Sequence, residues 1–119
     1  MVIDDDNGFR EMVRVALTKA GYVVTEAGDG KIGLASYRQD PADLVLTDIL
    51  MPNADGLETI RNLRRHDPQV KIIAMSGART QSYLALASTF GAQRVLAKPF
   101  AFDVLLTAIR EILAERVSH

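Results

Sequence analysis

Polar side chains that follow short apolar runs are the residues of this chain best placed to do chemistry. The run Leu44–Leu46 leads to Asp48, and Val2–Ile3 leads to Asp4 and Asp5. Open α/β sheets gather their functional groups at the carboxyl ends of the strands, so these acids are expected at one edge of a sheet. Considered alone, Asp48 would be interpreted as a residue that ends or caps a strand. The other acids and a lysine make a functional site the better interpretation.

Two further apolar runs end on Ser76 and Lys98. Three carboxylates that converge on one site repel one another unless a cation lies among them. Oxygen ligands without a nearby histidine or cysteine favour Mg²⁺, or Mn²⁺ as the second choice, over zinc or iron. Three other acids, Asp6, Asp29 and Asp55, are interpreted as cap and turn residues.

Composition narrows the class of protein. The chain has 119 residues, of which 48% are hydrophobic and 24% charged, so one globular domain with a real core is expected. A net charge of −1 gives no indication of nucleic acid or an anionic membrane as a direct partner. No apolar run approaches the roughly 18 residues of a membrane span, and the cytoplasm is the expected compartment. The absence of cysteine excludes disulfides and thiolate metal sites.

Short apolar strands alternate with helical patterns along the chain. Asn7 is interpreted as the N-cap of a helix that Gly21 closes, and Pro41 ends a second helix that contains Gly33. This glycine costs about 1 kcal/mol relative to alanine unless it permits close packing on the sheet. Strands are expected at residues 2–3, 22–25, 44–46, 70–75 and 95–97, and helices near residues 7–20, 30–40, 57–66, 80–90 and 102–116.

Strands that alternate with helices, each strand a continuous apolar run, predict a parallel sheet covered on both faces. Right-handed crossovers and short loops favour the doubly wound, flavodoxin-like strand order 2-1-3-4-5. No linker or repeat divides the sequence, so residues 1–119 are expected to form a single α/β domain.

Several short motifs together resemble those of a response-regulator receiver domain (CheY-like), and the resemblance covers essentially the whole chain. Each motif alone is weak, whereas their combination in this order is specific. The motifs are Val2–Asp6, Ala20–Tyr22, Asp29–Gly30, Asp48 with Met51–Pro52 and Asp55–Gly56, Met75–Gly77, and Lys98–Phe100. The resemblance implies one receiver domain that acts in two-component signal transduction.

Phosphoryl transfer onto Asp48 is what this resemblance implies, and the product would be an aspartyl phosphate. Mg²⁺ would be bound by Asp5, by Asp48 and by the backbone carbonyl of Leu50, while Asp4 would act through a metal-bound water. A carboxylate attacks an anionic phosphoryl group only where positive charge neutralises the phosphoryl oxygens. The resemblance assigns part of that charge to Lys98.

The other family positions have expected roles as well. The Ser76 hydroxyl would bond a phosphoryl oxygen, Gly77 would leave access for the donor, and the Lys98–Pro99 bond would be cis. The protein would be a phosphoacceptor that catalyses its own phosphorylation and a slow autodephosphorylation, not an enzyme with a separate substrate.

Phosphorylation is expected to repack the face made by helix four, strand five and helix five. Ser76 and Val95 would be the switch residues, and Val95 stands where the family usually has Tyr or Phe, so no aromatic rotamer change is expected. Leu50 and Ala78 would flank the approach of a hydrolytic water and carry no polar side-chain group. A comparatively long-lived phosphorylated form is therefore expected.

The expected partners are a histidine kinase or a histidine phosphotransfer protein, and an output partner or output domain that the sequence does not name. A homodimer that forms on phosphorylation is also considered. Because the chain stops soon after the last helix, it is interpreted as a stand-alone receiver or a module of a larger regulator.

Three alternatives were weighed against this function. A haloacid-dehalogenase-like phosphatase would need a second acid at the position of Leu50. A flavodoxin-type FMN carrier would need a hydroxyl-rich loop after the first strand, where this chain has Asp4, Asp5 and Asp6. A pseudo-receiver, which binds partners without phosphorylation, is expected to have lost an acid or the lysine, and none is missing here.

Overall fold

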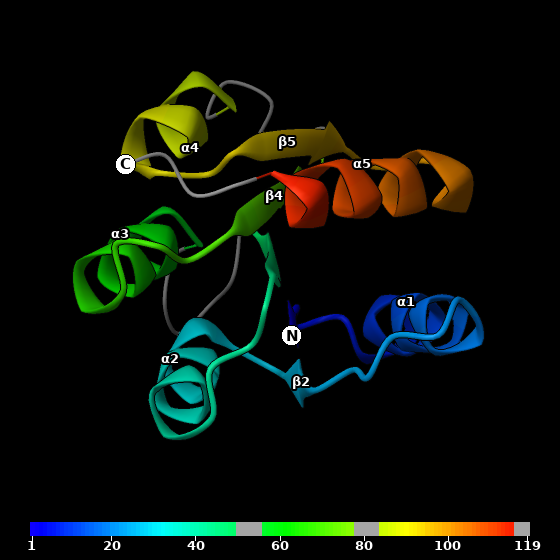
Figure 1. The fold of residues 1–119 in the computed structure, drawn as a ribbon, viewed down its shortest axis with the longest axis horizontal. Coiled ribbons are helices and arrows are strands. Elements are labelled where there is room, and N and C mark those ends of the chain that lie inside the picture. The colour runs from blue at the N-terminus through cyan, green and yellow to red at the C-terminus, as the bar shows by residue number, and fades with distance from the viewer. Residues whose placement is uncertain (50–55, 78–83, 116–119) are drawn as a thin grey trace.

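The computed structural model describes residues 1–49, 56–77 and 84–115. Strands and helices alternate along the chain, as Figure 1 shows. The strands are β1 (Val2–Ile3), β2 (Glu26–Ala27), β3 (Val45–Asp48), β4 (Ile72–Ser76) and β5 (Arg94–Ala97). The helices are α1 (Asn7–Lys19), α2 (Gly30–Gln39), α3 (Gly56–His66), α4 (Leu84–Phe90) and α5 (Phe102–Ala114).

The sheet is parallel and has the strand order β2-β1-β3-β4-β5. This confirms the predicted doubly wound α/β fold. Two apolar cores cover its faces. Val13 of α1 and Ile109 of α5 belong to one core, while Tyr37 of α2, Ile60 of α3 and Ala87 of α4 belong to the other. Figure 1 shows the same division, with α1 and α5 on one side of the sheet and α2, α3 and α4 on the other.

Helix ends follow the expected capping chemistry, with one correction. The N-cap of α1 is Asp6, whose Oδ1 accepts a hydrogen bond from the Phe9 backbone N–H at 3.1 Å. The prediction of Asn7 was wrong by one position, because both residue types cap well and local sequence cannot rank them. Asp29 caps α2, as predicted. Gly21 takes a positive φ of 98° beyond α1, the left-handed conformation that favours glycine at a helix end.

The second strand lies later in the chain than expected. Residues 22–25 were predicted as this strand, but the residues that pair with β1 are Glu26 and Ala27, opposite Val2 and Ile3. In this parallel register residues 22–25 lie before the start of β1, and their recorded backbone bond to β1 is the one that the Thr25 carbonyl accepts from the Val2 N–H at 2.8 Å. Val23 is consequently 97% exposed, although its neighbours pack against the core.

Other boundaries differ by a few residues. β4 begins at Ile72, two residues later than predicted, and ends on Ser76. The side chain of Gln93 bonds both the Val70 carbonyl and the Ile72 N–H at this point, at 3.2 and 2.7 Å. α5 ends at Ala114, before the predicted last turn with Arg116, which lies outside the described residues. The predicted start of helix four at residues 80–83 also lies outside them.

Close packing explains Gly33. A Cβ at this position would lie 2.4 Å from Cδ1 of Ile3, a fully buried residue of β1. The glycine therefore lets α2 pack tightly on the sheet, which was the condition under which its cost to the helix was expected to be offset. None of the helices in the described ranges has the length and apolar character needed to cross a membrane.

Candidate functional site

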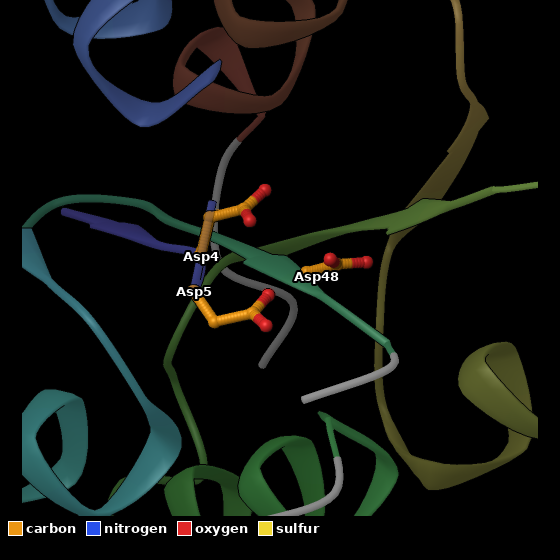
Figure 2. Close-up of side chains that lie close together, drawn as sticks. All are labelled: Asp4, Asp5 and Asp48. Carbon is orange, nitrogen blue, oxygen red and sulfur yellow. The ribbon is translucent and has the colours of Figure 1, made fainter. Parts of the chain in front are cut away.

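Three carboxylates meet at the carboxyl edge of the sheet. Asp4 and Asp5 follow β1, Asp48 ends the neighbouring β3, and one side-chain oxygen from each lies within 4.8 Å of the others. Figure 2 shows the three side chains as they leave these adjacent strands. Asp4 is fully buried and Asp48 is 9% exposed, whereas Asp5 is exposed. The parallel pairing of β1 with β3 is what brings the acids together.

Lys98 places its ammonium group against two of these acids. Its Nζ lies 2.9 Å from Oδ2 of Asp4 and 3.4 Å from Oδ2 of Asp48. The other oxygen of Asp4 accepts a hydrogen bond from the backbone N–H of Asp6 at 2.9 Å. The lysine side chain is only 21% exposed, so it is largely shielded from bulk water. The attraction between its ammonium group and the carboxylates is therefore stronger than it would be in water.

β4 and β5 position the other two predicted residues. The Lys98 backbone N–H donates to the Ser76 carbonyl at 2.6 Å, which places the lysine just beyond the end of the sheet. The Lys98–Pro99 peptide bond is cis. Ser76 is fully buried, and its hydroxyl donates to the Gly77 carbonyl at 3.2 Å. Among the described residues, no atom lies within 4 Å of the position that a Cβ on Gly77 would take.

The carboxylate cluster fits a hard divalent cation. Mg²⁺ binds oxygen at about 2.0–2.1 Å in octahedral geometry, so ligand oxygens around it are about 2.9 Å apart when adjacent and about 4.2 Å apart when opposite. The oxygens here lie within 4.8 Å of one another, so they are close enough to surround one partly hydrated ion after the side chains adjust. The donor set contains oxygen only, which favours Mg²⁺ or Mn²⁺. Asp5 has open space for a partly hydrated ion, because it is the exposed member.

Gly56, the first residue of α3, packs closely against the backbone at the end of β3. A Cβ on this residue would lie 2.1 Å from the Asp48 carbonyl oxygen and 2.5 Å from the Cα of Ile49. Its own N–H donates to the Ile49 carbonyl at 2.7 Å. Among the described residues only Gly21 and Gly91 have positive φ, so a left-handed conformation is not the reason for glycine at position 56. Its contribution is the close approach of α3 to the acid-bearing strand.

Sequence reasoning missed the residues that support the cluster from α1. Nη1 of Arg10 donates to the Asp4 carbonyl at 2.6 Å, and Nε of the same side chain lies 3.2 Å from Oε1 of Glu26. The Phe9 ring lies under the Lys98 ammonium, 4.1 Å from Nζ to the ring centroid. Nothing in the local sequence indicated the contact of Phe9 with Lys98.

The remaining predicted residues fall into two groups. Val95 pairs with Ala74 across β4 and β5, is partly buried, and packs against the core beneath α3 and α4. Leu50, with its expected metal-binding carbonyl, lies outside the described residues, and so do Asp55 and Ala78. The expectation of a slow loss of phosphate therefore stays a prediction, which phosphate release after donor removal would test.

A parallel sheet of this order, with acids and a lysine at its carboxyl edge, defines the receiver class of signalling domains. The chain belongs to this family: the model of the response regulator receiver domain matches residues 1–110. Two-component signalling is thereby its setting, and response regulators work with histidine kinases and output domains. The sequence resemblance is confirmed.

The chain matches some relatives along nearly their whole length and others along only about half of it. The chain is 35% identical to the chemotaxis protein CheY of Bacillus subtilis over 95% of both chains. It is 36% identical to the response regulator MprA of Mycolicibacterium vanbaalenii over 95% of this chain and 49% of that protein. The chain thus spans about half the length of MprA and of the similar transcriptional regulatory protein CseB of Streptomyces coelicolor.

Solved structures of other response-regulator proteins have the same fold as this chain. The receiver domain of NtrX from Brucella abortus has a TM-score of 0.92 at 26% identity, with 97% of this chain and 98% of that chain covered. TrrA from Thermotoga maritima, solved in complex with Mg²⁺ and BeF, has a TM-score of 0.84 at 30% identity, with 93% and 95% covered.

Proposed function

We propose that this receiver accepts a phosphoryl group on Asp48 from a phosphohistidine of a histidine kinase or of a phosphotransfer protein. A carboxylate oxygen of Asp48 forms the new bond to phosphorus while the bond from phosphorus to the donor imidazole breaks. The leaving nitrogen keeps the bonding electron pair and takes up a proton. The product is an aspartyl phosphate, which stores the signal as a covalent bond.

The contact of Lys98 with both Asp4 and Asp48 is the observation that carries this proposal. It brings a positive charge within 3.4 Å of the proposed nucleophile and leaves the ammonium next to the position that the incoming phosphoryl oxygens would occupy. Phosphoryl transfer depends mainly on such positioning and charge neutralisation. Mg²⁺, held by Asp5 and Asp48 with Asp4 beside it, would supply further positive charge.

Ser76 is the residue that would respond first when Asp48 is phosphorylated. Its hydroxyl lies at the end of β4 and donates to the neighbouring Gly77 carbonyl, and rotation about the Cα–Cβ bond would redirect it toward a phosphoryl group. The change would pass to the face formed by α4, β5 and α5. Val95 would follow by a small packing shift, because a β-branched side chain has few rotamers. Output partners or an output domain would bind that face.

Phosphorylation of Asp48 can be tested directly. The parent protein, Asp48→Asn, and the control Asp29→Asn are incubated with acetyl phosphate and Mg²⁺, and intact mass is measured. The parent and the control should gain one phosphoryl group, since asparagine still caps α2 at Asp29. Asp48→Asn should gain none.

Two outcomes would contradict the proposal. Equal labelling of Asp48→Asn would show that another residue is the acceptor. No labelling of the parent, by acetyl phosphate or by phosphorylated histidine kinase, would favour the pseudo-receiver alternative.

A further inference from the structure

One aromatic ring lies next to the ammonium group of Lys98, and a second ring packs against the first. The ring of Phe9, in the first turns of α1, has its centroid 4.1 Å from Nζ of Lys98. The ring of Phe100 packs against it in a T-shaped arrangement, with centroids 5.9 Å apart and planes at 73°. Both rings are half-buried and contact the core between α1 and α5. The site chemistry described above does not require either of them.

The ring face offers the ammonium a third favourable neighbour. Two carboxylates lie against it at 2.9 and 3.4 Å, and the Phe9 ring lies on a further side. Aromatic rings have negative faces, so a cation over the face is attracted, and the attraction is larger where water is partly excluded. Unlike a third carboxylate, the ring has no hydrogen-bond acceptor that would compete with phosphoryl oxygens for the lysine protons.

We propose that Phe9 is a positioning residue for Lys98, and that Phe100 holds the Phe9 ring in the required orientation. This inference rests on the proposed function, because it concerns the step in which Lys98 meets the phosphoryl oxygens. Phe9 itself touches no reacting atom. It keeps the ammonium directed at the edge of the sheet.

A persistent partner matters because the charges around Lys98 change during the reaction. A metal ion and a phosphoryl group would both draw Asp48 away from its contact with the lysine. A lysine has a flexible four-carbon stem, so a lost carboxylate contact would release it to many conformations. The Phe9 ring is unaffected by either event and limits that freedom before and after transfer.

Simple packing is the competing explanation for Phe9, because the residue also contacts the core. The packing explanation requires only an apolar side chain at position 9, whereas the positioning explanation requires an aromatic ring there. Leucine would keep apolar bulk and remove the ring face, whereas tyrosine would keep both. Methionine, unbranched and adaptable, serves as a second apolar substitute should leucine fail to fold.

The test compares Phe9→Leu, Phe9→Met and Phe9→Tyr with the parent. Phosphorylation rate is measured against acetyl phosphate concentration at saturating Mg²⁺, and thermal unfolding reports on folding. Removal of the ring should slow the maximal rate by roughly threefold to tenfold, the range that corresponds to one cation–π contact. Phe9→Tyr should stay within about twofold of the parent. Phe100→Leu should show a smaller loss of the same kind.

A second measurement needs no variant. The chain has four lysines, so the side-chain NMR signals of Lys98 can be assigned and compared with those of Lys19, Lys31 and Lys71. Protons over a ring face are shifted upfield, and Lys98 alone should show this shift in the parent. Phe9→Leu should abolish it, and Phe9→Tyr should keep it.

The outcomes separate this inference from the proposed function. A phosphorylated parent with a folded Phe9→Leu of equal rate would overturn the role of Phe9 and leave Asp48 as acceptor. A Phe9→Tyr as slow as Phe9→Leu, or no upfield shift of Lys98 in the parent, would also overturn it. A parent that takes no phosphoryl group would defeat the proposed function, and this inference with it.

Discussion

The two adjacent acids after β1 differ sharply in their surroundings. Asp4 is fully buried, with one oxygen bonded to Lys98 and the other to the Asp6 backbone N–H. Asp5 is exposed and belongs to the same carboxylate cluster. A buried carboxylate with both oxygens bonded has little freedom to rearrange around a metal. We therefore propose that Asp5 makes the direct metal contact and that Asp4 orients the lysine.

Removal of Asp5 should weaken Mg²⁺ binding by about tenfold or more, because Mg²⁺ relies on few carboxylates in such sites. The variant is Asp5→Asn, and Mg²⁺ affinity is measured by calorimetry or by NMR titration without any phosphodonor. Asp6→Asn is the matched control, since asparagine retains the N-cap of α1. Unchanged Mg²⁺ affinity in Asp5→Asn would show that the cluster is structural.

At the scale of elements, the start of α3 lies directly against the end of β3. Gly56 lies against the backbone of Asp48 and Ile49, and its lack of a side chain permits that approach. A helix with an ordinary residue there would have to move away from the strand. The position of the proposed acceptor thus depends on the absence of a side chain at Gly56.

Gly56→Ala should lower the free energy of unfolding by about 1–3 kcal/mol, the usual cost of a side chain forced into a packed position. Chemical denaturation measures it. The matched control is Gly77→Ala, because a Cβ there meets no atom of the described residues within 4 Å, and its stability should stay close to that of the parent. Equal stabilities of the two variants would contradict the close-approach argument.

At the scale of the whole molecule, polar contacts tie the elements together at the end of the sheet opposite the site. The Tyr37 hydroxyl of α2 donates to Oδ2 of Asp67, beyond α3, at 2.7 Å. This bond lowers the pKa of the Asp67 carboxyl, and the bond from the Gln69 N–H lowers it further. Burial, followed by the bond to Asp67, raises the pKa of Tyr37 above its ordinary value.

Tyr37→Phe should therefore reduce stability in a pH-dependent way. A carboxyl whose folded pKa is lowered stabilises the fold above its unfolded pKa of about 4, and this contribution disappears as pH falls through the folded pKa. At neutral pH the variant should lose about 1 kcal/mol. The difference from the parent should shrink as the pH is lowered below about 4.

Urea denaturation of both proteins between acid and neutral pH measures this difference. Tyr22→Phe is the control, because Tyr22 packs in the core on the opposite face of the sheet from Tyr37. A Tyr37→Phe deficit that stayed constant at every pH would show that the hydroxyl stabilises the fold independently of the Asp67 charge.

The amino-acid sequence by itself determined the strand order and the residues of the site edge. Alternating strands and helices leave few connections open, and parallel strands place their carboxyl ends together. Asp4, Asp5, Asp48, Ser76 and Lys98 could therefore be assigned to one edge without coordinates. Local capping chemistry likewise indicated Asp29 and Gly21, since each acts on its immediate neighbours.

Only the tertiary structure decided which residues pair and touch. The second strand was displaced to Glu26–Ala27 because its register depends on where β1 lies, and β-propensity does not contain that information. Gly56 meets Asp48 and Ile49 through the approach of α3 to the strand, and Phe9 meets Lys98 across almost the full length of the chain. Such contacts depend on the three-dimensional packing of separate elements, whereas sequence periodicity reports only the face on which each residue lies.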